Sequence, residues 1–139
     1  MMLVDTSVWI DFFRQANTPQ CRQLTQCLEE GSVTVGTADL VMFEVLRGFR
    51  RDAACQEAEF LLSALPQVEI GGAENALTAA ALYRRLRARG CTIRSPIDVL
   101  LASYCISHGH VLLHSDADFD LIGSFEDLNT WSHGTTRVP

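Results

Sequence analysis

Lysine is absent from this chain of 139 residues, and all 11 basic side chains are arginine. The absence excludes Walker-A phosphate loops, whose lysine reaches the phosphates, and it excludes Schiff-base chemistry at a lysine. It also counts against receiver domains and haloacid-dehalogenase-type phosphotransferases, which carry a lysine beside an acidic pocket. Arginine still suits phosphate recognition, because its planar guanidinium binds two oxygens at once.

Long apolar runs and targeting signals are also missing. No stretch approaches the about 20 apolar residues that span a membrane, and the four residues before Asp5 include no basic segment. We therefore expect a cytoplasmic protein with no membrane partner. The five cysteines lack the close spacing of a zinc or redox motif, and the four histidines lack an H-E-x-x-H pairing. These absences predict free, buried thiols and no zinc site.

The composition is that of one ordinary globular domain. Hydrophobic residues make up 47% of the chain and charged residues 20%, which suffices for a packed core at this length. We expect the domain to cover residues 1–131 and a polar, mobile tail to cover residues 132–139. The net charge of -6 argues against a nucleic-acid partner, unless several acids neutralise a bound cation.

Apolar patterns and breaker residues alternate along the chain as they do in βαβ units. Predicted strands cover residues 2–4, 33–35, 67–70, 110–115 and 125–128. Predicted helices cover residues 7–14, 19–30, 39–49, 52–65, 73–89, 96–108 and 118–122. Thr18 before Pro19 is a predicted N-cap, and Gly31 and Gly109 are predicted helix stops. The alternation predicts an α/β fold in which helices cover both faces of a mostly parallel sheet.

Four acidic side chains end or interrupt apolar runs, where acids are least expected: Asp5, Glu44, Asp98 and Asp116. Burying one unpaired carboxylate is costly, and burying four together is prohibitive without a cation. Two like charges about 4 Å apart repel by about 4 kcal/mol at an effective dielectric of about 20, and a small domain has only about 5–15 kcal/mol of stability. If the four acids meet, we expect raised pKa values or a bound hard cation.

The predicted topology brings these acids to one edge of the sheet. Asp5 and Asp116 each follow a predicted strand, and open parallel sheets bind ligands at the carboxyl ends of their strands. Glu44 and Asp98 lie in helices expected to begin near that edge, and the helix dipole favours an anion at Asp98. Oxygen-only ligands select Mg²⁺ or Mn²⁺ over zinc. The favoured interpretation is a cation site that acts on phosphates.

Simpler roles also fit these acids. Asp5 alone fits an N-cap of the first helix, and Asp98 fits a capping box with Ser95. Glu44 fits a surface ion pair with Arg47, although its neighbours are apolar. For each acid, the structural role and the cation-binding role are both open at this point.

Asp116, Asp118 and Asp120 alternate like the start of an EF-hand calcium loop. Leu121 and Asp127 stand where that loop needs glycine and glutamate, so an EF-hand is excluded. Asp118 fits either a helix cap or a further metal ligand. Asp120 is expected to face solvent.

Hydroxyl and arginine side chains surround the predicted site. Thr6 and Ser7 fit either helix capping or the holding of a water or phosphate at the site. Arg47, Arg50 and Arg51 fit either a solvated helix face or a track for an RNA backbone, and they follow Glu44 closely in sequence.

Four segments occur in the order and with the spacing of one known family. They are LVDTSVWID at 3–11, EVLRG at 44–48, IDVLLA at 97–102 and DADF at 116–119. Together they are specific and span essentially the whole chain, which resembles a PIN domain, in particular the toxin nuclease of a VapBC-type toxin–antitoxin pair.

The resemblance implies a three-layer α/β/α fold around a short, mostly parallel sheet. It implies an endoribonuclease that depends on Mg²⁺ or Mn²⁺, hydrolyses RNA phosphodiesters with metal-activated water, and is the toxin of a type II toxin–antitoxin pair. The catalytic and metal-binding set that it implies is Asp5, Glu44, Asp98 and Asp116, with Asp118 as a further metal ligand. It also implies a homodimer that a small antitoxin silences, often through a basic side chain that enters the acidic pocket.

The resemblance extends to the polar residues beside the acids. Ser7 or Thr6 matches the family's polar residue that assists the acidic site. The family often has threonine where this chain has His114, so the hydroxyl contact there is lost or falls to Ser115. His114 itself is a candidate contact to the scissile phosphate.

Two other functions fit parts of the pattern. A metal-dependent phosphatase or phosphotransferase with an aspartyl nucleophile needs a second aspartate two residues after Asp5, where Ser7 stands, and it needs a lysine. A non-catalytic acidic module that binds a basic partner needs only the acidic pocket. A trapped phosphoaspartate would support the first alternative, and metal binding without RNA cleavage would support the second.

Overall fold

The short apolar segment β1 (Met2–Val4) lies inside the sheet of the computed structural model, which describes residues 1–131. Its side chains are 3% exposed or less, as expected for a strand covered on both faces. The strands β2 (Val35–Ala38) and β4 (Val111–Leu113) flank it, and β3 (Gln67–Val68) lies beyond β2. The order is β3-β2-β1-β4, and all three pairings are parallel.

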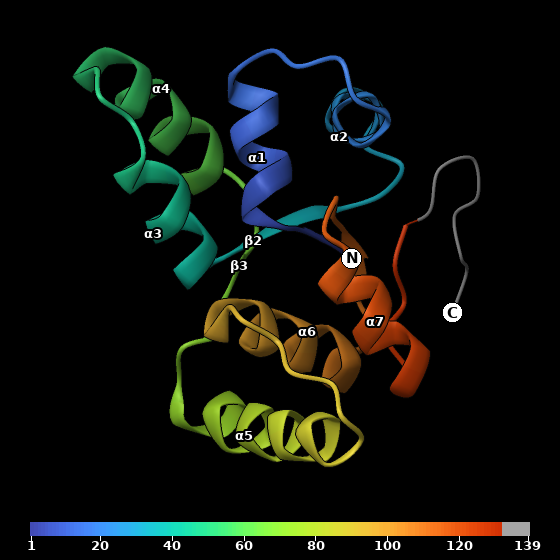
Figure 1. Cartoon of the computed structure of the whole chain (residues 1–139). Coiled ribbons are helices and arrows are strands. Elements are labelled where there is room, and N and C mark those ends of the chain that lie inside the picture. The colour runs from blue at the N-terminus through green and yellow to red at the C-terminus, as the bar shows by residue number, and fades with distance from the viewer. Residues whose placement is uncertain (132–139) are drawn as a thin grey trace.

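Within residues 1–131, seven helices form most of the connections between and after the strands (Figure 1). They are α1 (Thr6–Phe13), α2 (Pro19–Glu30), α3 (Asp39–Arg47), α4 (Asp52–Ser63), α5 (Ala73–Ala88), α6 (Pro96–His108) and α7 (Ala117–Phe125). Figure 1 shows α1 to α4 on one side of the sheet, α5 and α6 on the other, and α7 beside α6. This is the predicted α/β/α arrangement around a parallel sheet.

The helix boundaries confirm most of the predicted capping. Thr18 Oγ1 accepts a hydrogen bond from the backbone N–H of Cys21 at 3.1 Å and so caps α2. Gly31 and Gly109 follow α2 and α6 with φ of 67° and 68°, the left-handed conformation that glycine adopts without strain. The predicted capping box of α6 is wrong, because the Ser95 side chain makes no capping hydrogen bond.

Four predicted strands differ from the structure: those at 67–70 and 110–115 are longer than β3 and β4, and those at 33–35 and 125–128 differ more. β2 begins at Val35, two residues later than predicted, and runs on to Ala38. The strand predicted at 125–128 is wrong, because α7 continues to Phe125. The chain reaches the sheet only afterwards, where Thr130 forms an isolated parallel bridge with Leu112.

A continuous apolar core lies between the sheet and both helical layers. Its largest fully buried side chains include Trp9, Leu24, Leu62, Leu86 and Phe119. The five cysteines are free, and four of them are buried, as predicted. In the described part of the chain, the helices are too short or too polar to cross a membrane. The predicted tail at 132–139 lies outside the described residues, so the domain boundary at residue 131 stays a prediction.

The loop after β3 joins the two helical layers. The Asp39 carboxylate, at the start of α3, accepts the N–H of Ile70 at 2.7 Å and that of Gly71 at 3.3 Å. The buried Asn75 amide donates to the carbonyl of Ile70 at 2.8 Å and to that of Leu100, in α6, at 3.0 Å. A short chain of hydrogen bonds through Ile70 therefore sets α3 relative to α6.

Candidate active site

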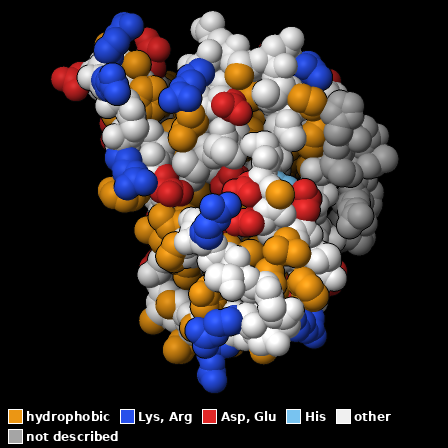
Figure 2. All heavy atoms as spheres, viewed as in Figure 1, with side chains coloured by type: hydrophobic (Ala, Val, Ile, Leu, Met, Phe, Trp, Pro, Cys, Tyr) orange, Lys and Arg blue, Asp and Glu red, His pale blue; other side chains and the backbone are white. Residues whose placement is uncertain are grey.

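The four predicted acids come from four different elements at one edge of the sheet. Asp5 directly follows β1 and caps α1, and Asp116 follows β4 and caps α7. Glu44 lies in the second turn of α3, and Asp98 lies in the first turn of α6. Figure 2 shows acidic side chains gathered at the middle of this face of the molecule. The parallel topology therefore brings together residues that are far apart in sequence.

Asp98 is at the centre of the acidic cluster. The pKa of its carboxyl group is raised to about 7, first by burial and then by the charges of Asp5, Asp116, Glu44 and Asp118, in that order. These repulsions show that the other four acids all lie close enough to act on Asp98. A cation placed among them would remove the repulsion that raises this pKa.

Three of the acids form a compact group. One carboxylate oxygen each from Asp98, Asp116 and Asp118 lies within 4.8 Å of the other two. Asp5 and Glu44 flank this group. A set of oxygen donors without nitrogen or sulfur suits a hard divalent cation such as Mg²⁺ or Mn²⁺. The residues present therefore fit the metal that the resemblance implies.

Ser7 holds the buried Asp5 carboxylate. Asp5 is 5% exposed, and burial raises its pKa. Ser7 donates to Asp5 Oδ2 through its hydroxyl at 2.6 Å and through its backbone N–H at 3.4 Å. Both bonds end on Oδ2, so Asp5 caps the helix with one oxygen. Ser7 Oγ also lies 3.1 Å from Ser115 Oγ, and the replacement of the family's hydroxyl contact by Ser115 stays a prediction.

Thr6 and Arg47 each contact a different oxygen of the Glu44 carboxylate. Thr6 Oγ1 donates to Glu44 Oε1 at 2.7 Å. Arg47 Nη2 lies 3.9 Å from Glu44 Oε2, with side chains that are 62% and 19% exposed. The ion pair that was the alternative explanation of Glu44 is therefore present. It is weak, because the distance from nitrogen to oxygen is long and Arg47 is exposed to water. It therefore does not account for a half-buried glutamate beside four aspartates.

The two further aspartates near the start of α7 have different environments. Asp118 belongs to the compact group of three, and the helix cap is made instead by Asp116, whose Oδ1 accepts the N–H of Asp118 at 2.9 Å. Asp120 is 72% exposed, as predicted.

His114 is buried, and each of its ring nitrogens lies near another group of the protein. It is 5% exposed, its Nδ1 lies 3.1 Å from the backbone nitrogen of Asp116, and its Nε2 lies 3.5 Å from Asp120 Oδ1. Both ring nitrogens are engaged within the protein, so the predicted contact to the scissile phosphate is wrong. Burial lowers the pKa of His114, which keeps the ring neutral near pH 7.

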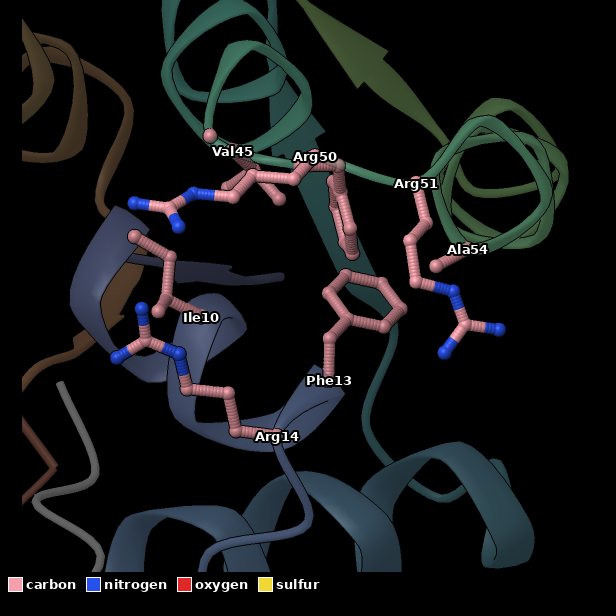
Figure 3. Close-up of a pocket in the computed structure, with 9 residues that line it drawn as sticks. Ile10, Phe13, Arg14, Val45, Arg50, Arg51 and Ala54 are labelled. Carbon is pink, nitrogen blue, oxygen red and sulfur yellow. The ribbon is translucent and has the colours of Figure 1, made fainter.

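The arginines of the predicted RNA track separate into two places. Arg47 lies beside Glu44, with its guanidinium 5.4 Å from the centre of the exposed Phe43 ring. Arg50 and Arg51 instead line a groove between α1, α3 and α4 with a cavity of about 220 Å³. Figure 3 shows Ile10, Phe13 and Val45 in this groove, with Arg14, Arg50 and Arg51 around it.

The fold and the site together define an α/β/α domain with a cluster of carboxylates at the carboxyl edge of its sheet. The chain belongs to the PIN domain family, which it matches over residues 2–124. Ribonuclease VapC11 of Mycobacterium tuberculosis is 33% identical over 132 residues, which are 95% of this chain and 98% of that protein. VapC ribonuclease Mb1587 of Mycobacterium bovis has the same identity and coverage.

Solved structures share this fold at lower sequence identity. VapBC2 from Rickettsia felis, bound to a DNA fragment from its promoter, matches with a TM-score of 0.73 and 18% identity over 94% of this chain and 98% of that chain. FitAcB from Neisseria gonorrhoeae matches with a TM-score of 0.70 and 14% identity over 95% of this chain and 97% of that chain. The likeness confirms the predicted fold class.

The variant Asp98→Asn is expected to stabilise the metal-free protein at pH 8 by about 1 kcal/mol, or about 2–6 °C in Tm, because it removes a charge that four others repel. Since the folded-state pKa of Asp98, about 7, is above its ordinary value of 3.8, the folded state binds the extra proton between these pH values. The contribution of Asp98 to stability therefore falls as pH rises through this window. Thermal unfolding in EDTA at pH 5 and pH 8 measures the difference between variant and wild type.

Asp120→Asn is the matched control, because it removes the same charge from an exposed position on α7. Its Tm difference from wild type is expected to be small at both pH values. If the Asp98→Asn difference does not grow from pH 5 to pH 8, Asp98 is not under the repulsion described here.

Proposed function

We propose that the protein is a metal-dependent endoribonuclease that acts on cytoplasmic RNA as the toxin of a type II toxin–antitoxin pair. The observation that carries the proposal is the group of Asp98, Asp116 and Asp118 at the sheet edge of a PIN domain. Relatives that are 33% identical over nearly the whole chain are named VapC ribonucleases, and this supports the assignment.

The acidic residues would hold Mg²⁺ or Mn²⁺, with Asp98, Asp116 and Asp118 as the nearest ligands and Asp5 and Glu44 beside them. Such an ion, when bound, lowers the pKa of a coordinated water and stabilises charge on a phosphoryl oxygen. Ser7 and Thr6 keep the carboxylates of Asp5 and Glu44 directed during the reaction. We infer that these acids are the catalytic set for hydrolysis of an RNA phosphodiester.

The geometry disfavours the alternative with an aspartyl nucleophile. Ser7 occupies the place of the second aspartate, and its hydroxyl and its backbone N–H both donate to Asp5 Oδ2. Those bonds draw electron density from the carboxylate and weaken it as a nucleophile, and the chain has no lysine to stabilise a phosphoryl group. A non-catalytic acidic module is separated from the nuclease by the cleavage experiment below.

The groove in Figure 3 is the surface that we assign to the antitoxin. It is lined by apolar side chains from α1 and α3 and surrounded by Arg14, Arg50 and Arg51. An apolar segment of the partner with acidic side chains beside it would match this lining in shape and charge. Toxin–antitoxin complexes among proteins of this fold support the presence of such a partner. The homodimer that the resemblance implies stays a prediction.

Purified protein is expected to cleave a mixed RNA pool in the presence of Mg²⁺ or Mn²⁺ and to be inactive in EDTA. Asp98→Asn is expected to lower the rate by at least about 100-fold, because it removes a charged ligand from the centre of the site. Gel analysis of end-labelled RNA measures cleavage. Because the same variant is expected to be more stable than wild type, its loss of activity cannot come from unfolding.

Asp120→Asn again serves as the control and is expected to retain activity. Wild-type activity in EDTA, or full activity of Asp98→Asn, would contradict the nuclease assignment. Metal binding without cleavage of any RNA in the pool would instead support a non-catalytic acidic module.

Arg47→Ala is expected to raise KM for RNA by about 3–10-fold with little change in kcat, because an exposed arginine beside the site contributes binding by charge. Arg84→Ala is the matched control, since Arg84 is an exposed arginine on α5, a helix that supplies none of the clustered acids. Steady-state cleavage at two salt concentrations measures both effects. Equal changes in the two variants would show that Arg47 acts only through net charge.

Ala54→Gln is expected to weaken antitoxin binding by at least about 10-fold and to leave RNA cleavage unchanged, because the longer side chain fills the groove. Ala53→Gln is the control on the same helix, since Ala53 is exposed and does not line the groove. Isothermal titration calorimetry with the cognate antitoxin measures the affinities. Unchanged affinity in Ala54→Gln would place the antitoxin elsewhere.

A further inference from the structure

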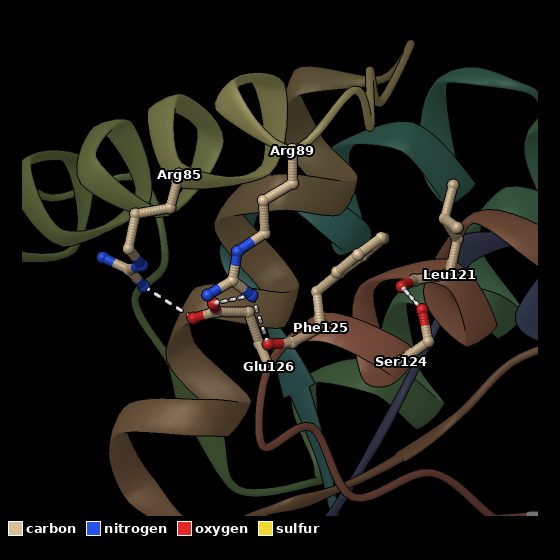
Figure 4. A network of polar contacts seen from close by, with 6 residues as sticks. All are labelled: Arg85, Arg89, Leu121, Ser124, Phe125 and Glu126. Atoms are coloured by element: carbon tan, nitrogen blue, oxygen red, sulfur yellow. Dashed lines mark hydrogen bonds and ion pairs between the residues drawn. The ribbon is translucent and has the colours of Figure 1, made fainter.

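α7 carries Asp118 and is capped by Asp116. Its placement therefore determines where two of the three grouped carboxylates lie. Arginine side chains at the end of α5 contact the C-terminal end of α7, as Figure 4 shows. Arg85 Nη2 lies 2.8 Å from Glu126 Oε1, and Arg89 Nη1 donates to the carbonyl of Phe125 at 3.0 Å. These contacts hold the C-terminal end of the helix but lie away from its first turn.

The first turn of α7 rests on His114. The imidazole is 5% exposed and packs against the ring of Phe119, with 5.1 Å between ring centres. Its Nδ1 lies 3.1 Å from the backbone nitrogen of Asp116, and its Nε2 lies 3.5 Å from Asp120 Oδ1. The ring thus spans one turn, from the N-cap residue to the residue four positions later.

These contacts determine the tautomer of the ring. A backbone N–H can only donate, so Nδ1 must accept from Asp116 and carries no hydrogen. In the neutral ring the hydrogen is then on Nε2, where it is directed at the Asp120 carboxylate. Asp120 is 72% exposed, so water screens that second contact. The bond from the Asp116 N–H to Nδ1 is therefore the stronger constraint.

We propose that His114, as the Nε2–H tautomer, is a positioning residue that fixes Asp116 and Asp118 in the acidic cluster. The bond to Nδ1 sets the backbone of Asp116. Asp116 Oδ1 then accepts the N–H of Asp118 at 2.9 Å, which sets the first turn of the helix. The inference rests on the proposed function, because the group that is positioned is the proposed metal site.

Two substitutions separate the two ring nitrogens. His114→Asn places an acceptor oxygen near the position of Nδ1, whereas His114→Gln places its amide near the position of Nε2 and leaves the Asp116 N–H without an acceptor. Both variants lose the ring contact with Phe119, so a merely structural role predicts similar losses in both. Thermal unfolding of each variant reports that shared loss.

Titration of the full-length proteins with Mn²⁺, followed by calorimetry, tests the positioning role. His114→Asn is expected to keep the Kd within about 3-fold of wild type, and His114→Gln is expected to weaken it by about 10–100-fold, as removal of a residue behind a metal ligand does. Equal Kd values in the two variants would overturn the proposal.

The tautomer gives a second readout that needs neither metal nor a variant. Nitrogen-15 NMR of the metal-free wild-type protein is expected to show an unprotonated, pyridine-type Nδ1 and a protonated, pyrrole-type Nε2 in His114. The reverse assignment would overturn the proposal. If wild type binds no Mn²⁺, the proposed function fails, and the positioning role is then decided by this tautomer together with the amide resonances of Asp116 and Asp118, which only His114→Gln is expected to shift.

Discussion

The mutual repulsion of the carboxylates around Asp98 is the constraint on which the rest of the structure depends. Burial and, after it, the charges of the neighbouring acids raise the pKa of Asp98 to about 7, so the fold holds these acids together against an unfavourable interaction. Each flanking acid is fixed by its own donor: Ser7 for Asp5 and Thr6 for Glu44. The bond from Ser7 is local, whereas the bond from Thr6 joins the start of α1 to α3. In both bonds the donor and the acceptor lie on rigid elements.

The scaffold behind the site explains how four separate segments reach this precision. The parallel sheet brings the ends of β1 and β4 together, and this fixes Asp5 relative to Asp116. Glu44 and Asp98 come from opposite helical layers, so no strand pairing sets their separation. The hydrogen bonds of Asp39 and Asn75 to Ile70, and of Asn75 to Leu100, perform that task. Because Ile70 and Asn75 are buried, leaving these groups unpaired would be costly, and the arrangement is correspondingly rigid.

The sequence predicted those parts of the molecule that local patterns determine. Buried strands, proline after an N-cap and glycine stops depend on neighbouring residues, so most elements and the α/β class followed from them. The four acids were recognised because a carboxylate in an apolar run has few explanations. Long-range contacts left no local signal: the strand predicted at 125–128 is the last residue of α7 followed by a loop. His114 was assigned to substrate for the same reason, since its bonds to Asp116 and Asp120 depend on how α7 folds back over the ring.

The acidic site and the arginine-rimmed groove share their supporting helices. α1 is capped by Asp5 and lines the groove through Ile10 and Phe13, while α3 carries Glu44 next to Val45, a groove residue. A partner seated in the groove therefore contacts the two helices that hold two of the five acids. Coupling between partner and site then needs no long pathway, because a small rotation of either helix moves a carboxylate directly. The separation of acidic and basic side chains on the surface is consistent with such coupling. Acids gather at one place on α1, α3 and their neighbours, and arginines surround the groove between α1, α3 and α4, so the same helices present surfaces of opposite charge.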